Sequence, residues 1–340
     1  MLKRNITLYC IVVLFLFSCK TERVPSDQGI SIDNKYDSEF PSKSVSKNLN
    51  SISKSVKKLD ILAFYATYYF PLEARISKSS INDSILNVYS DNMTINNESV
   101  SGTVSVVYNN SNLLGLLTCA HIVDFQDTVY SYHDDNNSQV ETISIKIKQQ
   151  NHVSGLPPGD AIEIAAISKE KDIALLMKKT TPHDQRIHVL NYPLGKVKDL
   201  QWGSIVYIMG YPLGTLMVTR ALVSLTDKIK IGMFVTDALY NRGISGSPVF
   251  AVKDGVPNFE LVGIASSSAA QVTNFLIPGR NYKADNKIMT PYKGDIFVDN
   301  NKLISYGVTY SVSIDEIITF MSNNEKGLIS NGFDMSNFFK

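Results

Sequence analysis

Short apolar segments separated by turn residues dominate the chain from residue 99 onward. In some of them polar and apolar residues alternate, as in "VETISIKIK" at 140–148, where Ile143, Ile145 and Ile147 share one face. Ten segments of this character predict β-strands: 102–108, 113–123, 140–148, 161–167, 172–178, 204–212, 221–225, 233–238, 247–252 and 261–267. Because the strands are short and follow one another directly, they favour an antiparallel barrel or sandwich over alternating strands and helices.

Two other segments favour helices. In "SIDEIITFM", Ser313 and Glu316 form a capping box ahead of an apolar stripe, which predicts a helix near the C-terminus. The stripe consists of Ile314, Ile317, Ile318 and Met321. Residues 56–76 are apolar enough for a short helix, which Pro71 would interrupt. We expect residues 56–98 to form an N-terminal extension, partly helical, that packs on the main domain.

The N-terminus has the pattern of an export signal. Lys3 and Arg4 precede an apolar run at 9–17, which is too short to cross a bilayer and is typical of a signal peptide. The run ends in "LFSC", which resembles the lipobox of bacterial lipoproteins and implies cleavage before Cys19 and acylation of its thiol. The alternative is a plain secretory signal with an incidental cysteine. We expect a signal peptide over 1–18 and, because Ser, Lys, Asn and Asp prevail, a flexible tether over 19–55.

Composition excludes several classes of protein. The formal net charge of +1 leaves no excess of Lys and Arg to neutralise phosphates, which argues against nucleic acid as a partner. No spacing of Cys and His resembles a zinc site, so we expect neither a metal ion nor another cofactor. Cys10 would leave with the signal peptide, and an acylated Cys19 would leave Cys119 without a cysteine partner. No intramolecular disulfide is therefore expected in an exported domain that its core must stabilise.

Three polar residues stand at the edges of predicted strands in the order His, Asp, Ser. His121 follows the strand in "LLTCAHIV", Asp172 opens the strand in "KDIALLMK", and Ser245 lies in the glycine-flanked turn "RGISGSP". Each of them alone is more often structural, and a turn of Gly, Ser and Pro needs no chemistry. Together they suit nucleophilic catalysis, in which a base takes the proton of a serine hydroxyl.

The surrounding motifs resemble those of the trypsin-fold serine peptidases, and within them the bacterial HtrA/Deg type. "TCAH" matches the T-x-x-H of the family, and "DIALL" matches its D-(IL)-A-(LV)-(LI). "GYPLGTLMVTRALVS" resembles its G-x-P-x-G…V-T-x-G-x-V-S, "TDALYNRGISGSPVF" resembles its T-D-A-x-x-x-x-G-N-S-G-G-P-(LV), and "VGIASSS" resembles the strand after the nucleophile. The resemblance covers residues 99–322 and implies an all-β fold of two six-stranded antiparallel barrels with a C-terminal helix. Residues 323–340 are expected to be a tail, too short for the PDZ domain of that family.

The resemblance also implies the role of each residue. Ser245 would attack a peptide carbonyl, and His121 would first take the serine proton and then give it to the leaving amine. Asp172 would orient the imidazole and stabilise its charged form. The backbone N–H groups of Gly243 and Ser245 would form the oxyanion hole.

Specificity residues follow from the same resemblance. Leu239, six residues before the nucleophile, falls at the base of the pocket for P1, the residue before the scissile bond. A leucine there implies an apolar or small P1 residue. Ser266, Ser267 and Ser268 would belong to the strand that pairs with the substrate backbone, and residues 305–311 would supply the last pocket wall. Residues 269–303 form a long segment that contains "IPGRNYKADNK" and "YKGD", which look like exposed loops. A specificity or gating role and a plain surface excursion are both open for this segment.

The chain departs from the family pattern at three positions. Ile244 replaces the usual Asn or Asp before the nucleophile, Ser247 replaces the second Gly of S-G-G-P, and Arg220 stands where Gly is frequent. None of the three removes a reacting group, and Ser247 is expected to pack in the strand. Ile244 raises the question of how the oxyanion loop is anchored.

The expected function is that of a serine endopeptidase of the bacterial cell envelope, anchored to a membrane through Cys19 and acting on polypeptides. The main alternative is a catalytically silent trypsin-fold module that binds peptides or partner proteins. An esterase with the same triad is weaker, because the sequence has no G-x-S-x-G elbow.

Overall fold

The structure is a computed structural model that describes residues 32–41, 43–110, 112–133, 136–157, 161–180, 187–226, 232–239, 241–278, 294 and 296–340. The chain divides into two units, Met1–Asp33 and Asn34–Lys340. The predicted signal peptide, Cys19 and the first part of the predicted tether lie outside the described residues. Within the described ranges, no helix has the length and apolar character needed to cross a membrane.

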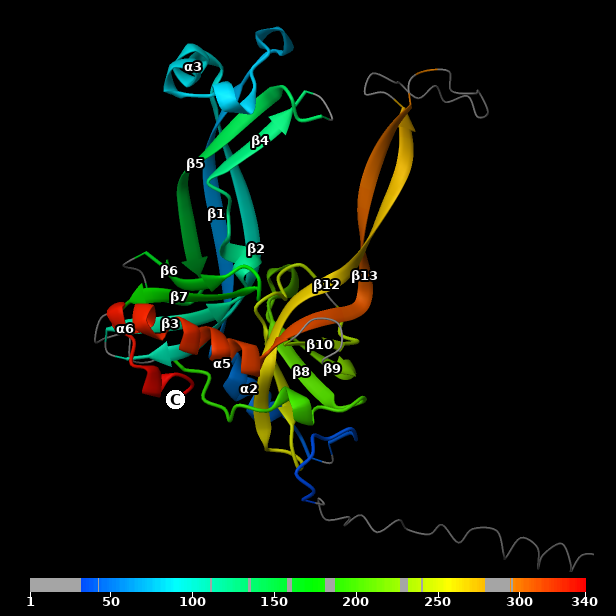
Figure 1. Cartoon of the computed structure of the whole chain (residues 1–340). Helices are drawn as coiled ribbons and strands as arrows, with labels where there is room; N and C mark the ends of the chain where they lie inside the picture. Colours follow the sequence, from blue (N-terminus) through cyan, green and yellow to red (C-terminus); the bar gives the residue numbers. More distant parts are fainter. Residues whose placement is uncertain are drawn as a thin grey trace, which may run out of the picture. The chain divides into compact units, whose positions relative to one another are not determined.

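The second unit consists mainly of β-strands (Figure 1). The strands are β1 (Val56–Tyr69), β2 (Thr94–Asn109), β3 (Leu113–Thr118), β4 (Thr128–Tyr132), β5 (Val140–Val153), β6 (Glu163–Ser168), β7 (Ile173–Lys179), β8 (Ile205–Gly210), β9 (Met217–Thr226), β10 (Met233–Thr236), β11 (Pro248–Val252), β12 (Phe259–Pro278) and β13 (Ile296–Ser313). The α-helices are α2 (Ser46–Ser53), α3 (Asp83–Val88), α4 (Ala120–Val123), α5 (Ile314–Asn323) and α6 (Glu325–Ser330). Short 3₁₀ turns are η1 (Leu72–Ala74), η2 (Lys78–Ser80), η3 (Ser90–Asn92), η5 (Val197–Asp199), η6 (Pro212–Gly214) and η7 (Met335–Asn337). Each of the ten segments predicted as strands contains a strand, although the one predicted over 113–123 ends at Thr118 and is followed by helix α4.

The first sheet has seven strands in the order β4-β5-β1-β2-β3-β7-β6. The sequence predicted a closed barrel of six strands here, and this prediction is wrong: the sheet is only half closed. β4 pairs with the first residues of β5, from Val140 to Ile145, whereas β6 pairs with β7 at the other end of the sheet order. Because β1, β2 and β5 are long, the strands at the two edges lie at different heights and do not meet (Figure 1).

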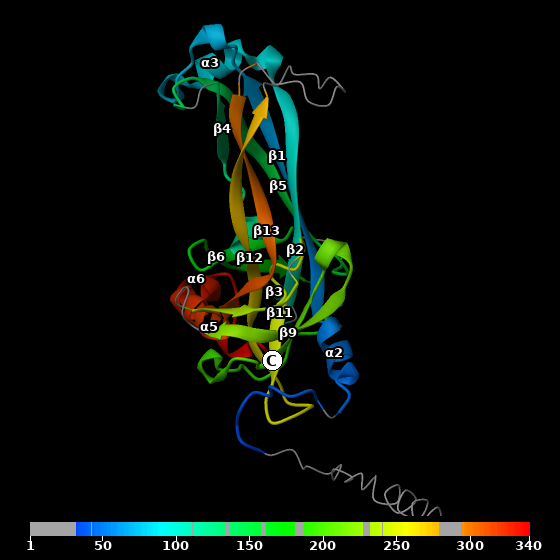
Figure 2. The same cartoon turned by 90° about the vertical axis from the view of Figure 1, so that its right-hand side faces the viewer.

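The second sheet is a closed barrel in the order β10-β13-β12-β11-β8-β9, as the resemblance implied. Beyond the barrel, β12 and β13 continue as a two-stranded ribbon, seen in yellow and orange in Figure 2. Their pairing extends from Gly263 and Ser313 to Pro278 and Ile296. Residues 269–278 and 296–303 of the long segment before the last barrel strand are strands, because each supplies the other with backbone hydrogen-bond partners. The stretches predicted as exposed loops lie largely outside the described residues.

The prediction of a helix at the start of the N-terminal extension is wrong for residues 56–69. They form strand β1, where a helix was expected, and β1 pairs with β2 on one side and β5 on the other. The apolar residues alternate between buried and half-buried positions, which is the period of a strand. Pro71 comes after the strand and does not interrupt it. β1 is therefore a central member of the first sheet, and the short helices of the extension follow it. Near them Phe70, Val140 and Ile143 form a small separate core.

One large apolar cluster joins the first sheet to the barrel. It includes Leu116 and Leu117 of β3 together with Phe250 of β11 and Phe259 of β12, all nearly inaccessible to solvent. The cluster holds the two sheets against each other, so that loops from both can contribute to one site.

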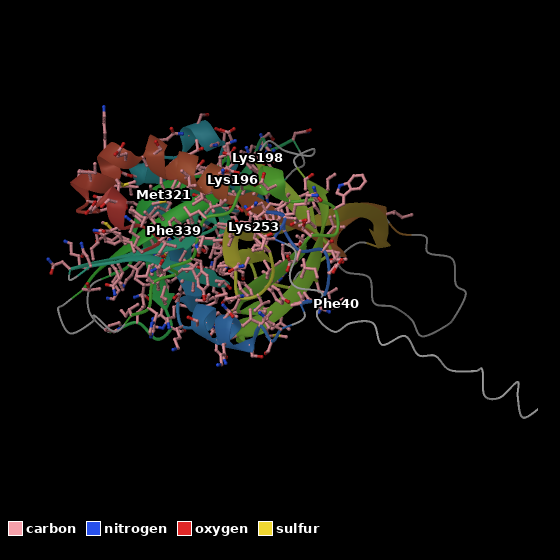
Figure 3. All side chains as sticks on the ribbon, turned by 90° about the horizontal axis from the view of Figure 1, so that it is seen from below. Phe40, Lys196, Lys198, Lys253, Met321 and Phe339 are labelled. Atoms are coloured by element: carbon pink, nitrogen blue, oxygen red, sulfur yellow. The ribbon has the colours of Figure 1, made fainter. Side chains whose placement is uncertain are left out.

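The end of the predicted tether is ordered on the barrel. Tyr36 is buried and forms an isolated β-bridge with Lys253, and its hydroxyl donates to the Glu260 carboxylate at 2.6 Å. Lys253 lies on the face drawn in Figure 3. Burial and this carboxylate raise the pKa of Tyr36 far above its usual value, so the phenol stays protonated. The prediction of a flexible tether up to residue 55 is therefore wrong for residues 34–55, which also include helix α2.

The predicted C-terminal helix is confirmed as α5. The Ser313 hydroxyl accepts a hydrogen bond from the Glu316 N–H at 3.1 Å and caps the helix. Ile318, one member of the predicted stripe, is 43% exposed, and Phe320 is buried in its place. The segment expected as a tail continues into α6 and packs three phenylalanines against the first sheet. Two of them, Phe333 and Phe338, contact the ring of Tyr108.

Candidate catalytic site

Two neighbouring strands of the first sheet bring His121 and Asp172 together. His121 lies in α4, directly after β3, and Asp172 directly precedes β7, which pairs with β3. The His121 Nδ1 atom lies 2.9 Å from each carboxylate oxygen of Asp172, and the His121 backbone N–H donates to Oδ1 at 2.9 Å. The carboxylate therefore fixes both the ring and the backbone of the histidine. Asp172 has a φ of +56°, an uncommon backbone conformation for a residue other than glycine.

Ser245 comes from the barrel and completes a chain of hydrogen bonds. Its Oγ lies 3.0 Å from the His121 Nε2 atom and 2.8 Å from the Ser266 carbonyl oxygen. A serine hydroxyl has one proton, so it can donate to only one of the two at a time. The polar atoms of Asp172, His121 and Ser245 thus form a continuous path, although His121 is separated from them by 51 and 124 residues in the chain.

The turn around Ser245 depends on two glycines. Gly243 and Gly246 have φ values of +102° and +83°. A Cβ at Gly243 would lie 2.3 Å from the Tyr211 carbonyl oxygen, and one at Gly246 would lie 2.0 Å from the Thr103 carbonyl oxygen. Both distances are too short for any side chain. The turn therefore requires glycine at these positions for its positive φ and for the lack of space.

The electrostatics of the site favour an ionised aspartate. Burial by itself raises the pKa of Asp172, but hydrogen bonds from His121 and Ser266 outweigh burial and leave the pKa below its usual value. The Ser266 hydroxyl donates to Asp172 Oδ2, an atom that also lies 2.9 Å from His121 Nδ1. Cys119 is fully buried close by, and burial together with the Asp172 charge raises the pKa of its thiol well above the usual value. The thiol is therefore protonated and poorly reactive.

Cys119, His121 and Asp172 also form a group whose potential metal-ligand atoms lie within 4.8 Å of one another in the described chain. Each of the three residues already has a hydrogen-bond partner within the protein. The Cys119 thiol donates to the Ala265 carbonyl at 3.3 Å, and the other two bind each other.

The remaining predicted residues have varied positions. Leu239 lies on the segment between β10 and the turn and is 61% exposed. Ser267 and Ser268 lie in β12 and pair with Tyr310 and Thr309 of β13, inside the segment predicted as the last pocket wall. Ser247 is fully buried, and its hydroxyl has no hydrogen-bond partner among the described residues.

Sequence reasoning missed two contacts. Ser266 was assigned to the strand that pairs with substrate, and its hydroxyl bond to Asp172 had no local signal, because the two residues lie 94 positions apart. Thr103 of β2 was assigned no role. Its N–H donates to the Ser245 carbonyl at 2.8 Å and its hydroxyl donates to the Gly243 carbonyl at 2.7 Å. Only the fold could show that this threonine contacts the turn.

Comparison with known proteins agrees with this geometry. Residues 101–264 match the family model described as the trypsin-like peptidase domain. No curated protein gives a significant match to the chain. The chain is thus similar to the trypsin-like peptidase domain over these residues, and the match includes His121, Asp172 and Ser245. It leaves out β1 and β13, which the structure adds to the first sheet and to the barrel.

Proposed function

We propose that the protein is a serine endopeptidase in which Asp172, His121 and Ser245 form the catalytic triad. The observation that carries the proposal is the hydrogen-bonded path from the Asp172 carboxylate through both ring nitrogens of His121 to Ser245 Oγ. The trypsin-like peptidase domain over residues 101–264 supports the same reaction class.

The first half of the reaction acylates the serine. His121 Nε2 takes the Ser245 proton as Oγ forms a bond to the carbonyl carbon of the scissile peptide. The tetrahedral intermediate then loses its C–N bond, and the Nε2 proton passes to the departing amine. The acyl group remains on Ser245 as an ester.

The second half hydrolyses this ester. His121 Nε2 takes a proton from water, whose oxygen attacks the ester carbonyl, and then returns the proton to Ser245 as the C–O bond breaks. Asp172 stays ionised throughout, holds the proton on Nδ1 and stabilises the imidazolium. Its lowered pKa supports this role.

The N–H groups of Gly243 and Ser245 form the oxyanion hole in this proposal. Three observations support it for Gly243: the positive φ, the lack of space for a Cβ, and a carbonyl bonded to Thr103. In the described part of the chain the Gly243 N–H has no hydrogen-bond acceptor, so it is available to an oxyanion.

Hydrolysis and active-site labelling test the proposal. We expect a fluorophosphonate probe to label the full chain, and a denatured polypeptide to be cleaved. The Ser245→Ala variant should lose label and about 10⁶-fold in kcat, whereas Ser247→Ala, which removes the other hydroxyl of the turn, should keep its label. An unlabelled and inactive wild-type protein that still binds peptides would favour the silent binding module instead.

We also propose that the enzyme prefers an apolar or small P1 residue and has an HtrA-type specificity. This proposal rests on Leu239 at the position of the pocket base, on a segment next to the nucleophile turn. A peptide library that varies P1 should give the highest kcat/KM with small or apolar residues. The Leu239→Asp variant should shift the preference to Lys and Arg, because a carboxylate at the pocket base pairs with a basic side chain. An unchanged P1 profile in this variant would contradict the role of Leu239.

The cellular location is the third part of the proposal. We infer that Cys19 carries a lipid that anchors the protein in the bacterial cell envelope, because a basic segment, an apolar run and "LFSC" stand in that order. Growth with an alkyne-tagged fatty acid should label the wild-type protein in the membrane fraction. The Cys19→Ser variant should not be labelled, whereas Cys10→Ser should retain the label if Cys10 is removed with the signal peptide.

A further inference from the structure

We propose that Thr103 is the positioning residue that holds the nucleophile loop, residues 241–247, in the arrangement that the oxyanion hole requires. This inference rests on the proposed peptidase function. Ile244 stands next to the nucleophile with its side chain 1% exposed in the apolar core, so it offers the loop no polar anchor. Thr103 reaches the same loop from β2 with an uncharged hydroxyl.

The direction of each oxyanion N–H is fixed through the preceding carbonyl. In a trans peptide the C=O and the following N–H point in opposite directions, so a donor that holds the carbonyl also orients the amide. The Arg242 carbonyl accepts from the Leu213 N–H at 2.8 Å, which orients the Gly243 N–H. The Ile244 carbonyl accepts from the Ser247 N–H at 3.0 Å, which orients the Ser245 N–H.

The Thr103 hydroxyl links the nucleophile loop to the first of these constraints. Its hydroxyl donates to the Gly243 carbonyl at 2.7 Å and accepts from the Tyr211 N–H at 2.9 Å. Tyr211 directly precedes the η6 turn that contains Leu213, and the Leu213 N–H is the group that holds the Arg242 carbonyl. One side chain therefore connects the nucleophile loop to the turn that orients its first amide.

The surroundings leave this hydroxyl little freedom. Thr103 is fully buried, and its carbonyl accepts from the Thr118 hydroxyl at 2.7 Å. A Cβ at Gly210 would lie 2.6 Å from Thr103 Oγ1, so glycine in β8 makes room for the hydroxyl. Removing the hydroxyl would leave the Tyr211 N–H and the Gly243 carbonyl without a partner among the described residues, which is costly and favours rotation of the loop peptides.

The test compares two substitutions at Thr103 in the full chain. Thr103→Val removes the hydroxyl and keeps the shape, and we expect kcat to fall by up to about 10²-fold with little change in KM, as for loss of one oxyanion donor. Thr103→Ser keeps the hydroxyl and should recover most of kcat. Thr67→Val is the matched control: Thr67 is buried in β1 and bonds Ser144 at 2.9 Å, far along the chain from the loop, so it should affect stability but not kcat.

Several outcomes overturn the inference. A Thr103→Val variant with wild-type kcat would overturn it, and so would one in which only KM rises. A folded Thr103→Ser variant with a kcat as low as that of Thr103→Val would also overturn it. If Thr103→Val does not fold, the test uses Thr103→Cys instead, because a thiol is a poorer hydrogen-bond donor of similar volume. The inference then requires a reduced kcat in Thr103→Cys. A crystal structure of the folded variant provides a readout without turnover. A displaced Arg242–Gly243 peptide supports the inference and an unmoved one contradicts it, even if an inert wild-type protein has disproved the peptidase function.

Discussion

The two halves of the candidate site are built differently. The half from the barrel contains Ser245, which is 4% exposed, and every residue of its turn from Gly243 to Ser247 is buried. The half from the first sheet contains His121 and Asp172, whose side chains are 45% and 20% exposed. Backbone hydrogen bonds and the buried Thr103 hydroxyl hold the serine half, whereas one carboxylate holds the imidazole.

This difference matches what each half has to do in the proposed reaction. The nucleophile and the oxyanion donors must keep fixed positions while charge develops, and preorganised backbone groups provide this without reorganisation. The imidazole must accept and release protons in contact with substrate and water, and an exposed ring with one firm partner permits this. We therefore expect the histidine half to be sensitive at a single carboxylate and the serine half to be sensitive in its backbone conformation.

Among the substitutions around the nucleophile, the one at the carboxylate is expected to have the largest effect. Asp172→Asn should lower kcat by about 10⁴-fold, because the amide no longer favours the imidazole tautomer with a free Nε2. Steady-state kinetics on a peptide substrate measure this. Asp127→Asn removes a charge from an exposed ion pair with Lys146 and serves as the control with unchanged kcat. A fall of less than tenfold in Asp172→Asn would remove the distinction between the two halves.

The backbone of the serine half should be nearly as sensitive. Gly243→Ala forces a Cβ to within 2.3 Å of the Tyr211 carbonyl oxygen at a φ of +102°, so the loop must shift. We expect kcat to fall by about 10²- to 10³-fold through loss of an oxyanion donor. Gly327→Ala in α6 is the control, since nothing lies within 4 Å of the added methyl group and helix propensity improves. Equal kinetics of the two variants would show that the turn tolerates displacement.

A smaller effect is expected where the two halves touch. Ser266→Ala removes the hydroxyl bond to Asp172 but leaves the contacts of the carboxylate with the ring and the backbone of His121. A hydrogen bond to a charged group is worth about 1.5–3 kcal/mol, so a loss of about ten- to hundredfold in kcat is expected. The Ser267→Ala variant of the neighbouring serine in β12 should have wild-type kcat. If Ser266→Ala lost as much kcat as Asp172→Asn, Ser266 would be as necessary for the imidazole as the carboxylate itself.

The smallest effect concerns stability in acid. Because the folded-state pKa of Asp172 is lowered, its ionised form stabilises the fold fully above the unfolded-state pKa of about 3.9. This contribution is lost as the pH falls through the lower, folded-state pKa. The difference in urea midpoint between wild type and Asp172→Asn should thus be constant from about pH 7 to 5 and should change below about pH 4 in favour of the variant. A difference that does not vary with pH would mean that the carboxylate is not held in its charged form.

The local pattern was sufficient for most strands and failed for β1. The apolar pattern of Val56–Tyr69 was ambiguous, since almost every residue from Ile61 to Tyr69 is apolar or aromatic, and the alternation between buried and half-buried positions is visible only in the structure. Such a run fits a buried strand and a helix equally well. The pattern also could not predict whether the first sheet closes, because closure depends on where the edge strands β4 and β6 pair along their neighbours.

The reacting residues were visible in short motifs, whereas the residues that hold them were not. His121, Asp172 and Ser245 each stand beside a recognisable apolar strand, and the motifs around them are ordered along the chain. Ser266 and Thr103 act through bonds to residues 94 and 140 positions away. Neither position differs in local composition from the strand that contains it.

By itself, the sequence determined the β-rich domain, the order of most strands, the capped helix α5 and the three candidate reacting residues of the turn and loops. These features depend on period, turn chemistry and neighbours within a few positions. Only the tertiary structure decided that one sheet closes and the other does not, that β12 and β13 continue as a ribbon, and that Thr103 contacts the loop of "RGISGSPVF". The reason is physical: strand pairing and buried hydrogen bonds are contacts between distant segments, and their partners are chosen by the packing of the whole domain.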